Sequence, residues 1–123
     1  MPITVSQQHA RVPVTILHVH GQVNLGNAHE LEQAGRAALD HGARHVLLDL
    51  SQVSSLTSAG LRAVHTLYRL LGSPTSDPGG VPAKSPYLKV LNPSPDIRRV
   101  LSLAGFEAFI DIHDDLAQAL ASF

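Results

Sequence analysis

The chain has 123 residues, of which 44% are hydrophobic, and this suffices for one domain with a single core. Nine basic and ten acidic residues give a formal net charge of −1, which provides no broad positive field for nucleic acid or an acidic membrane surface. Cysteine is absent, which excludes disulfides, thiolate metal sites and cysteine nucleophiles.

The sequence shows no targeting or membrane-spanning segment. Residues 1–9 lack a basic start followed by a long apolar run, and no later segment approaches the roughly 18 apolar residues of a spanning helix. We therefore expect a cytoplasmic protein with one domain, residues 1–123, and no membrane partner.

The first half of the chain predicts a strand, a helix and a second strand. Residues 12–19 are β-branched and aliphatic, which is typical of a strand, and Gly21 ends it. Asn24 and Asn27 offer turn or N-cap side chains before apolar residues at helical spacing, which predict a helix over residues 27–40. The apolar run 45–50 then predicts a strand buried on both faces at the sheet centre.

The second half begins with a helix over residues 58–71, because Leu61, Val64, Leu67, Tyr68 and Leu71 recur at spacings of three and four. Residues 72–86 are rich in Pro, Gly and Ser and predict a surface loop. This loop is either a disordered insertion or a segment that a partner orders.

The remaining residues predict a strand, a helix, a strand and a last helix. The strands are expected at residues 87–91 and 109–112, and a helix that ends at Gly105 lies between them. In the last helix, the inner face would carry Leu116, Ala119, Leu120 and Phe123. This alternation predicts an α/β fold, with a mixed sheet of four to five strands and about four helices as a single layer on it.

Hydroxyl side chains stand where the strand at residues 45–50 gives way to the helix at 58–71. The first turn of a helix has unpaired backbone N–H groups and partial positive charge. Ser58 or Thr57 can therefore act as a helix cap there, or carry a stabilised phosphate. Leu61 should anchor the turn in the core.

The segment Leu48–Gly60 resembles the STAS domains of bacterial anti-sigma factor antagonists, with an LDLS-like strand followed by a Ser-Ala-Gly-Leu helix start. The resemblance extends to the Gly21–Asn24 turn, where the family usually has Gly-Glu-Leu-Asp, to Leu91-Asn92-Pro93 and to Ala104-Gly105-Phe106. It covers residues 12–121, and only the Pro/Gly loop lacks a counterpart.

The resemblance implies a STAS-like single domain that binds an anti-sigma factor which is also a serine-protein kinase. This kinase would phosphorylate Ser58, with Thr57 as a secondary site, and a PP2C-type phosphatase would remove the phosphate. The implied partner-binding residues are Asn24, Thr57, Ser58, Ala59, Gly60 and Arg62. Gly60, which lacks a Cβ, would let another backbone or the kinase approach the first turn closely.

Two positions depart from the family pattern. Thr57 and Asn24 stand where the family often has acidic residues, just before the phosphorylated serine and at the end of the Gly-Glu-Leu-Asp turn. Relatives with a hydroxyl at the first position exist, and Asn24 still supplies a carbonyl for capping. Arg62 is either a solvated residue of the helix face or a contact for a partner or a phosphate.

Other chemistry-bearing residues have simpler interpretations. His18 and His20 share a strand face and His41 and His45 flank a turn, but no third metal ligand is placed by the sequence. Asp49 is either a catalytic or magnesium-binding acid or a structural hydrogen-bond acceptor for loop amides. Motifs of hydrolases, P-loop proteins and zinc peptidases are absent, so we expect no enzyme, metal or cofactor.

Three functions remain open at this stage. The first is a partner-switching antagonist that releases its partner when Ser58 is phosphorylated. The second is a STAS scaffold or transport-complex subunit that is never phosphorylated. The third is small-ligand binding in a pocket near the Ser58 turn.

Overall fold

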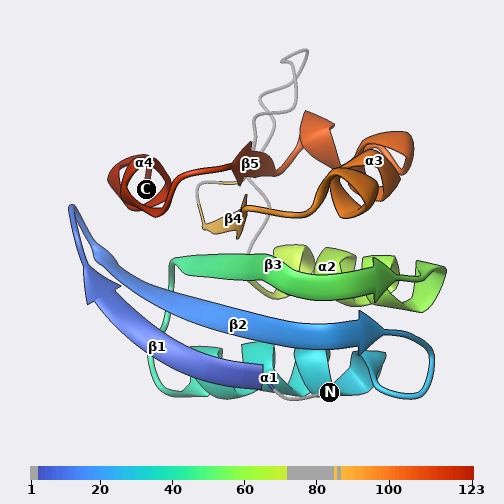
Figure 1. Cartoon of the computed structure of the whole chain (residues 1–123). Helices are drawn as coiled ribbons and strands as arrows, with labels where there is room; N and C mark the ends of the chain where they lie inside the picture. Colours follow the sequence, from blue (N-terminus) through green and yellow to red (C-terminus); the bar gives the residue numbers. More distant parts are fainter. Residues whose placement is uncertain (1–2, 72–84, 86) are drawn as a thin grey trace, which may run out of the picture.

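Five strands form one sheet in the order in which they occur in the chain (Figure 1). The computed structural model describes residues 3–71, 85 and 87–123. Within these residues the elements are β1 (Ile3–His9), β2 (Pro13–Val23), α1 (Ala28–Asp40), β3 (Val46–Leu56), α2 (Ser58–Leu71), β4 (Leu88–Leu91), α3 (Pro95–Leu103), the 3-10 turn η1 (Phe106–Ala108), β5 (Asp111–His113) and α4 (Leu116–Ala121).

The sheet is mixed, because β1 is antiparallel to β2 and the pairs β2–β3, β3–β4 and β4–β5 are parallel. Right-handed crossovers between parallel strands in sequential order place every connecting helix on the same face of the sheet. Residues of α1, α2 and α3 accordingly share one large buried cluster with β2, β3 and β4. The α/β class and the predicted numbers of strands and helices are confirmed.

The expectation of a single helical layer is wrong. A second apolar cluster lies on the opposite face of the sheet, where Ala119, Leu120 and Phe123 at the C-terminus cover strand residues. These strand residues are Val14, Ile16, Leu47 and Leu91. Because α4 follows the last strand, no crossover constrains its side, and it covers the otherwise open face.

The inner face that the sequence predicts for α4 also needs a correction. Ala119 is fully buried, but Leu116 is 41% exposed. The helix has six residues, and the Asp115 side chain caps it by accepting a hydrogen bond from the Gln118 amide at 3.3 Å. Such a short helix can bury little more than one turn.

The strands depart from the expected boundaries in two ways. β1 was not expected, because its sequence Ile-Thr-Val-Ser-Gln-Gln-His is largely polar, and it lies at the sheet edge with Val5 57% exposed. β2 and β3 run to Val23 and Leu56, well beyond the predicted ends. Register shifts between His18 and His20 and between Gly21 and Gln22 mark irregular pairing in the added part.

The predicted loop over residues 72–86 lies outside the described residues except for Ser85. Ser85 is buried, and its hydroxyl accepts hydrogen bonds from the amides of Tyr87 and Leu88, both at 3.2 Å. This bonding orients the chain as it enters β4. No helix within the described ranges combines the length and the apolar character needed to cross a bilayer.

Candidate functional site at the start of helix α2

The turn from β3 to α2 is held against the end of β2. Val23 pairs with Leu56, the last residue of β3. The Thr57 amide and hydroxyl both donate to the Val23 carbonyl, at 3.0 and 3.2 Å. The Thr57 carbonyl accepts from the Leu61 amide at 2.9 Å and so opens the helix. Ser58 is the first helical residue, and it is exposed.

The loop between β2 and α1 lies beside this turn, because it begins directly after Val23 (Figure 1). The Asn27 side chain accepts from the Asn24 amide and donates to the Gln22 carbonyl, both at 2.8 Å. The Asn24 side chain in turn accepts from the Gly26 amide at 3.0 Å. The two asparagines thus shape the loop by hydrogen bonds within it, and Asn27 forms no side-chain cap on α1.

One residue of this loop was missed by the sequence analysis. Leu25 is 85% exposed, which is the largest exposure among the exposed large hydrophobic residues of the described chain. It lies one residue from Asn24, in the loop that adjoins Thr57. An apolar residue within an Asn-Leu-Gly-Asn turn is the local signal that could have identified it.

Gly60 faces the interior of the protein rather than the solvent. A Cβ at this position would lie 2.5 Å from Leu56 Cδ1 and 2.9 Å from Val23 Cγ1. Gly60 is buried, so its close neighbours are side chains of β2 and β3. This differs from the expected role, in which the missing Cβ would admit another backbone or the kinase, because the atoms nearest to Gly60 belong to side chains of this chain's own core.

The other predicted residues of the first turn divide between the core and the surface. Ala59 and Leu61 are half-buried and pack against the main apolar cluster, as expected for Leu61. Arg62 is exposed one turn after Ser58. Residues four apart share a helix face, so the Arg62 guanidinium is available to a group bound at Ser58.

The electrostatics at this helix start favour an anion. The first turn of α2 carries no acidic residue, and the helix has 14 residues. Unpaired N–H groups and the helix dipole stabilise a negative charge at such a terminus by about 0.3–1 kcal/mol when it is exposed. A negative charge at this exposed helix start is therefore electrostatically favourable.

The structure brings Asn24, Thr57, Ser58 and Arg62 to one end of the sheet and turns Gly60 inward. The family model described as "Mlab, STAS domain" matches residues 6–77, which is more than half of the chain. The chain belongs to the STAS domain family.

Two proteins similar to this STAS domain are named as anti-sigma factor antagonists. BtrV of Bordetella bronchiseptica, named as an anti-sigma factor antagonist, is 30% identical over 85% of this chain and 82% of its own length. An anti-sigma factor antagonist from Mycobacterium paratuberculosis is 27% identical, with a TM-score of 0.75 over 98% of this chain and 93% of that one. The recognition of the family from the residues is thereby confirmed.

A more distant structure shares the fold alone. The phosphorylated form of the Bacillus cell fate determinant SpoIIAA is 16% identical, with a TM-score of 0.56 over 95% of this chain and 96% of that chain. The architecture of this STAS domain is therefore also that of a protein whose structure is known in a phosphorylated form.

The STAS domain also contains a hydrogen-bonded chain of side chains across three strands. His18 Nδ1 lies 2.7 Å from Asp49 Oδ2, and His18 Nε2 lies 2.8 Å from Ser6 Oγ. Asp49 Oδ1 accepts from the Ser51 amide at 3.0 Å. The structural interpretation of Asp49 is therefore supported. The link to His18 and Ser6 was missed because Ser6 lies on the unpredicted strand β1.

These contacts determine the ionisation of Asp49. Burial by itself raises the pKa of Asp49, but hydrogen bonds from Ser51 and His18, together with the charge of His18, outweigh it. The net result is a pKa below the ordinary aspartate value. Asp49 is thus a carboxylate at neutral pH and an anchor for β2 and β3.

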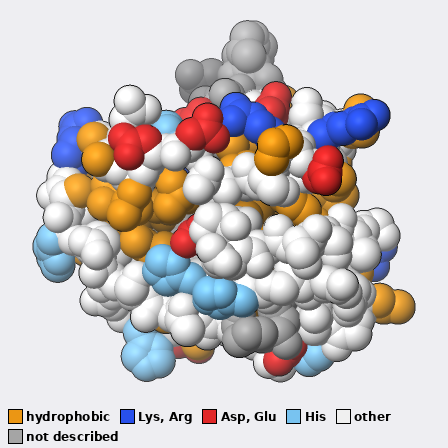
Figure 2. Space-filling view, in the orientation of Figure 1, with side chains coloured by type: hydrophobic (Ala, Val, Ile, Leu, Met, Phe, Trp, Pro, Cys, Tyr) orange, Lys and Arg blue, Asp and Glu red, His pale blue; other side chains and the backbone are white. Residues whose placement is uncertain are grey.

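The histidines of the STAS domain have separate surroundings. His41 Nδ1 donates to the Ala37 carbonyl at 2.7 Å, and His45 lies 5.8 Å from the rings of both Tyr87 and Phe123. Burial lowers the pKa of His45. Figure 2 shows histidine side chains near the middle of one face, with an acidic side chain beside them. Among residues 3–71, 85 and 87–123, no three metal-ligating side chains gather.

Proposed function

We propose that this STAS domain is an anti-sigma factor antagonist that works by partner switching. The unphosphorylated protein binds an anti-sigma factor with serine kinase activity in the cytoplasm and so frees a sigma factor. Phosphorylation of Ser58 releases that partner, and a PP2C-type phosphatase restores binding. The domain itself acts as a binding module rather than as an enzyme.

The observation that carries this proposal is the exposure of Ser58 at the start of α2, at the end of the sheet that also carries the exposed Leu25. Leu25 and the first turn of α2 lie at the same end of the sheet, so one partner surface can cover both. Apolar side chains at the centre of an interface contribute much of the binding free energy when they are desolvated. Names of the relatives BtrV and the mycobacterial protein support the same role.

The effect of the phosphate follows from the charge it adds. A phosphoserine carries about −1.5 to −2 charges. The helix terminus favours this charge by about 0.3–1 kcal/mol in the free protein. A desolvated charge without a partner at an interface costs several kcal/mol, so the interface is lost and the fold is kept.

Intact mass after incubation with the cognate kinase and ATP tests the phosphosite. We expect the wild type to gain one phosphate and Ser58→Ala to gain none. Ser54→Ala, which removes an exposed hydroxyl from β3 rather than from the helix, should gain the phosphate normally. A wild type without the gain, or a gain that persists in Ser58→Ala, contradicts the proposal.

Binding of the partner tests the switch through a pair of variants of nearly equal shape. Ser58→Asp adds a charge and should weaken binding by at least tenfold, whereas Ser58→Asn should stay within a few-fold of the wild type. The melting temperature of Ser58→Asp should not fall, because an acidic residue suits the first turn. Equal binding by both variants would instead favour the scaffold or transport-complex subunit.

The docking role of Leu25 has a matched control on another part of the surface. Leu25→Ala should weaken partner binding by at least tenfold. Leu103 on α3 is similarly exposed, at 79%, so Leu103→Ala should leave the affinity unchanged. Equal effects of the two substitutions would remove Leu25 from the proposed interface.

A further inference from the structure

Ser6, His18 and Asp49 have the geometry of an activated serine nucleophile. Ser6 Oγ lies 2.8 Å from His18 Nε2, and His18 Nδ1 lies 2.7 Å from Asp49 Oδ2. A hydroxyl, an imidazole and a carboxylate that are hydrogen-bonded in this order form a Ser-His-Asp triad, whose roles depend on geometry and not on chain position. The three residues lie on the neighbouring strands β1, β2 and β3, so the sheet holds them in line.

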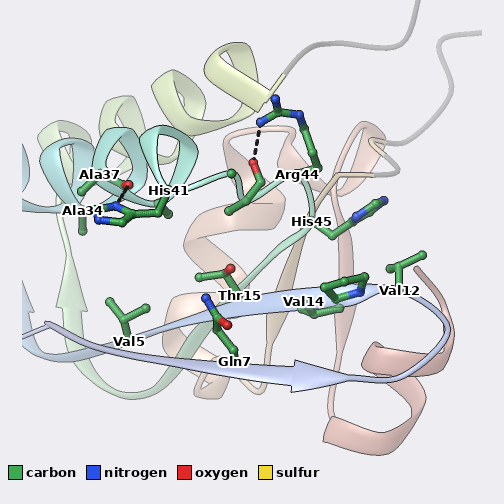
Figure 3. Close-up of a pocket in the computed structure, with 14 residues that line it drawn as sticks. Val5, Gln7, Val12, Val14, Thr15, Ala34, Ala37, His41, Arg44 and His45 are labelled. Carbon is green, nitrogen blue, oxygen red and sulfur yellow. Dashed lines mark hydrogen bonds between the residues drawn. The ribbon is translucent and has the colours of Figure 1, made fainter.

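The triad lies on the face of the sheet that is turned away from α1. Figure 3 shows the side chains of Val5 and Gln7 rising from β1 toward α1, where both line a cavity of about 680 Å³. Ser6 lies between them in the strand and therefore points to the opposite face. The cavity lies at the end of the sheet opposite Ser58, so the pocket expected near the Ser58 turn does not coincide with it.

The direction of the hydrogen bonds makes His18 a base toward Ser6. Asp49 is a carboxylate at neutral pH, because its pKa lies below the ordinary value, and a carboxylate only accepts hydrogen bonds. His18 Nδ1 therefore carries a proton, and in the uncharged imidazole Nε2 is the acceptor. The Ser6 hydroxyl donates to Nε2, which is the contact through which a base removes the proton of a nucleophile.

Burial decreases from the carboxylate toward the imidazole. The Asp49 side chain is 15% exposed, the His18 side chain is 31% exposed, and Ser6 is half-buried. Ile16 and Leu47, two residues before His18 and Asp49, belong to the apolar cluster under α4. The triad thus begins beside the part of the sheet that α4 covers, and a small molecule can reach the imidazole and the hydroxyl from solvent.

From these contacts we propose that Ser6 is a nucleophile that takes up an acyl group from a neutral activated ester. The Ser6 oxygen bonds to the carbonyl carbon, and its proton passes to His18 Nε2. The bond from that carbon to the leaving oxygen then breaks, and the leaving oxygen takes the proton from His18. The products are an ester of Ser6 and a free alcohol or phenol. Asp49 acts through His18, as a positioning residue that stabilises the protonated imidazole.

The charge of the triad selects a neutral acyl donor. An anionic phosphoryl donor would bring its negative charge toward the Asp49 carboxylate, and like charges repel. The product is a chain modified once at Ser6, so the site is a modification site and not a catalytic cycle. It is separate from the proposed phosphorylation of Ser58 and does not depend on it.

Incubation of the full chain with p-nitrophenyl acetate, followed by acid quenching, intact mass and peptide mapping, tests the acceptor. We expect an acetyl ester at Ser6 in the wild type and none at this position in Ser6→Ala. Thr4→Ala removes an exposed hydroxyl from the same strand and should leave the acetylation of Ser6 unchanged. A wild type without an acetyl group at Ser6 would overturn the proposal.

Substitution of the histidine tests the base. His18→Gln should slow the acetylation of Ser6 at least tenfold, because no group then accepts the proton of the hydroxyl. His20→Gln is the control, since His20 is also half-buried on β2 but lies outside the triad. Equal rates in the two variants would contradict the role of His18.

A thiol in place of the hydroxyl gives a second measurement, because the chain contains no cysteine. In Ser6→Cys the imidazole of His18 should favour the thiolate, so alkylation by iodoacetamide should be at least tenfold faster than in Gln8→Cys. Gln8 is more exposed than Ser6 on the same strand, so exposure alone predicts the reverse order. The advantage should disappear when His18→Gln is added to Ser6→Cys. Equal alkylation of the two thiol variants would overturn the proposed activation.

Discussion

Within the first turn of α2, Ser58 and Gly60 lie two positions apart and have opposite surroundings. Ser58 is exposed, and Gly60 is pressed against Leu56 and Val23. The missing side chain at Gly60 lets the helix start lie directly on the ends of β2 and β3. This close packing leaves Ser58 at the surface, at the same end of the sheet as the β2–α1 loop. Gly60 is itself buried, and it contributes to the proposed switch by positioning Ser58.

Asp49 is the residue at which stability should depend most clearly on pH. Its folded pKa is lower than the ordinary aspartate value of about 3.9, so its stabilising effect is fully present above that pH. The effect is lost as the pH falls through the folded pKa. We expect Asp49→Asn to lower the free energy of unfolding by about 1–2 kcal/mol at neutral pH, and the difference from the wild type to shrink below pH 4.

Urea denaturation between pH 3 and pH 7 measures this difference. Asp40→Asn is a suitable control, because Asp40 is exposed at the end of α1. If the wild type and Asp49→Asn lose stability in parallel over the whole range, the bonds from Ser51 and His18 do not contribute in the way described.

The contact between helices α1 and α2 depends on a glycine in the middle of a helix. Gly35 is buried in α1, and a Cβ there would overlap Leu67 Cδ2 of α2. Alanine is favoured over glycine within a helix by about 0.5–1 kcal/mol, but overpacking a core costs about 1–3 kcal/mol. We therefore expect Gly35→Ala to destabilise the fold by about 1 kcal/mol.

A double-mutant cycle with Leu67→Ala separates the two effects. In the Leu67→Ala background the overlap is gone, so Gly35→Ala should become neutral or stabilising by up to about 1 kcal/mol. The measurement is the free energy of unfolding of the four proteins in urea. The same cost of Gly35→Ala in both backgrounds would mean that Leu67 is not what requires the glycine.

At the scale of the whole molecule, strand β3 connects the two apolar clusters. Leu48 belongs to the large cluster under α1, α2 and α3, and its neighbour Leu47 belongs to the smaller cluster under α4. Successive residues of a strand point to opposite faces of the sheet. A substitution that weakens either cluster therefore also disturbs β3, which contributes residues to the other cluster.

This arrangement predicts a single cooperative unfolding transition. Far-UV circular dichroism and the fluorescence of the two tyrosines should give the same midpoint in urea, because the chain contains no tryptophan. Leu47→Ala should lower both midpoints equally, with a cost of about 2–5 kcal/mol. Separate midpoints for the two probes would show that the α4 side unfolds independently.

The amino-acid sequence by itself determined the order of the main helices and strands and the position of Ser58 at a helix start. These features depend on local information, namely apolar periodicity, turn residues and the short motif from Leu48 to Gly60. The stripe that contains Val64 and Leu67 predicted the buried side of α2 because a helix repeats within a few residues.

Only the tertiary structure decided the remaining features. Strand β1 is polar and becomes a strand through pairing with β2, and α4 takes its side of the sheet from the apolar surface left open there. The pairing of Val23 with Leu56 brings the loop that carries Leu25 to the end of the sheet where Ser58 lies, and no local pattern encodes a pairing between residues so far apart in the chain. The inward direction of Gly60 arises for the same reason, since it depends on how separate elements pack together.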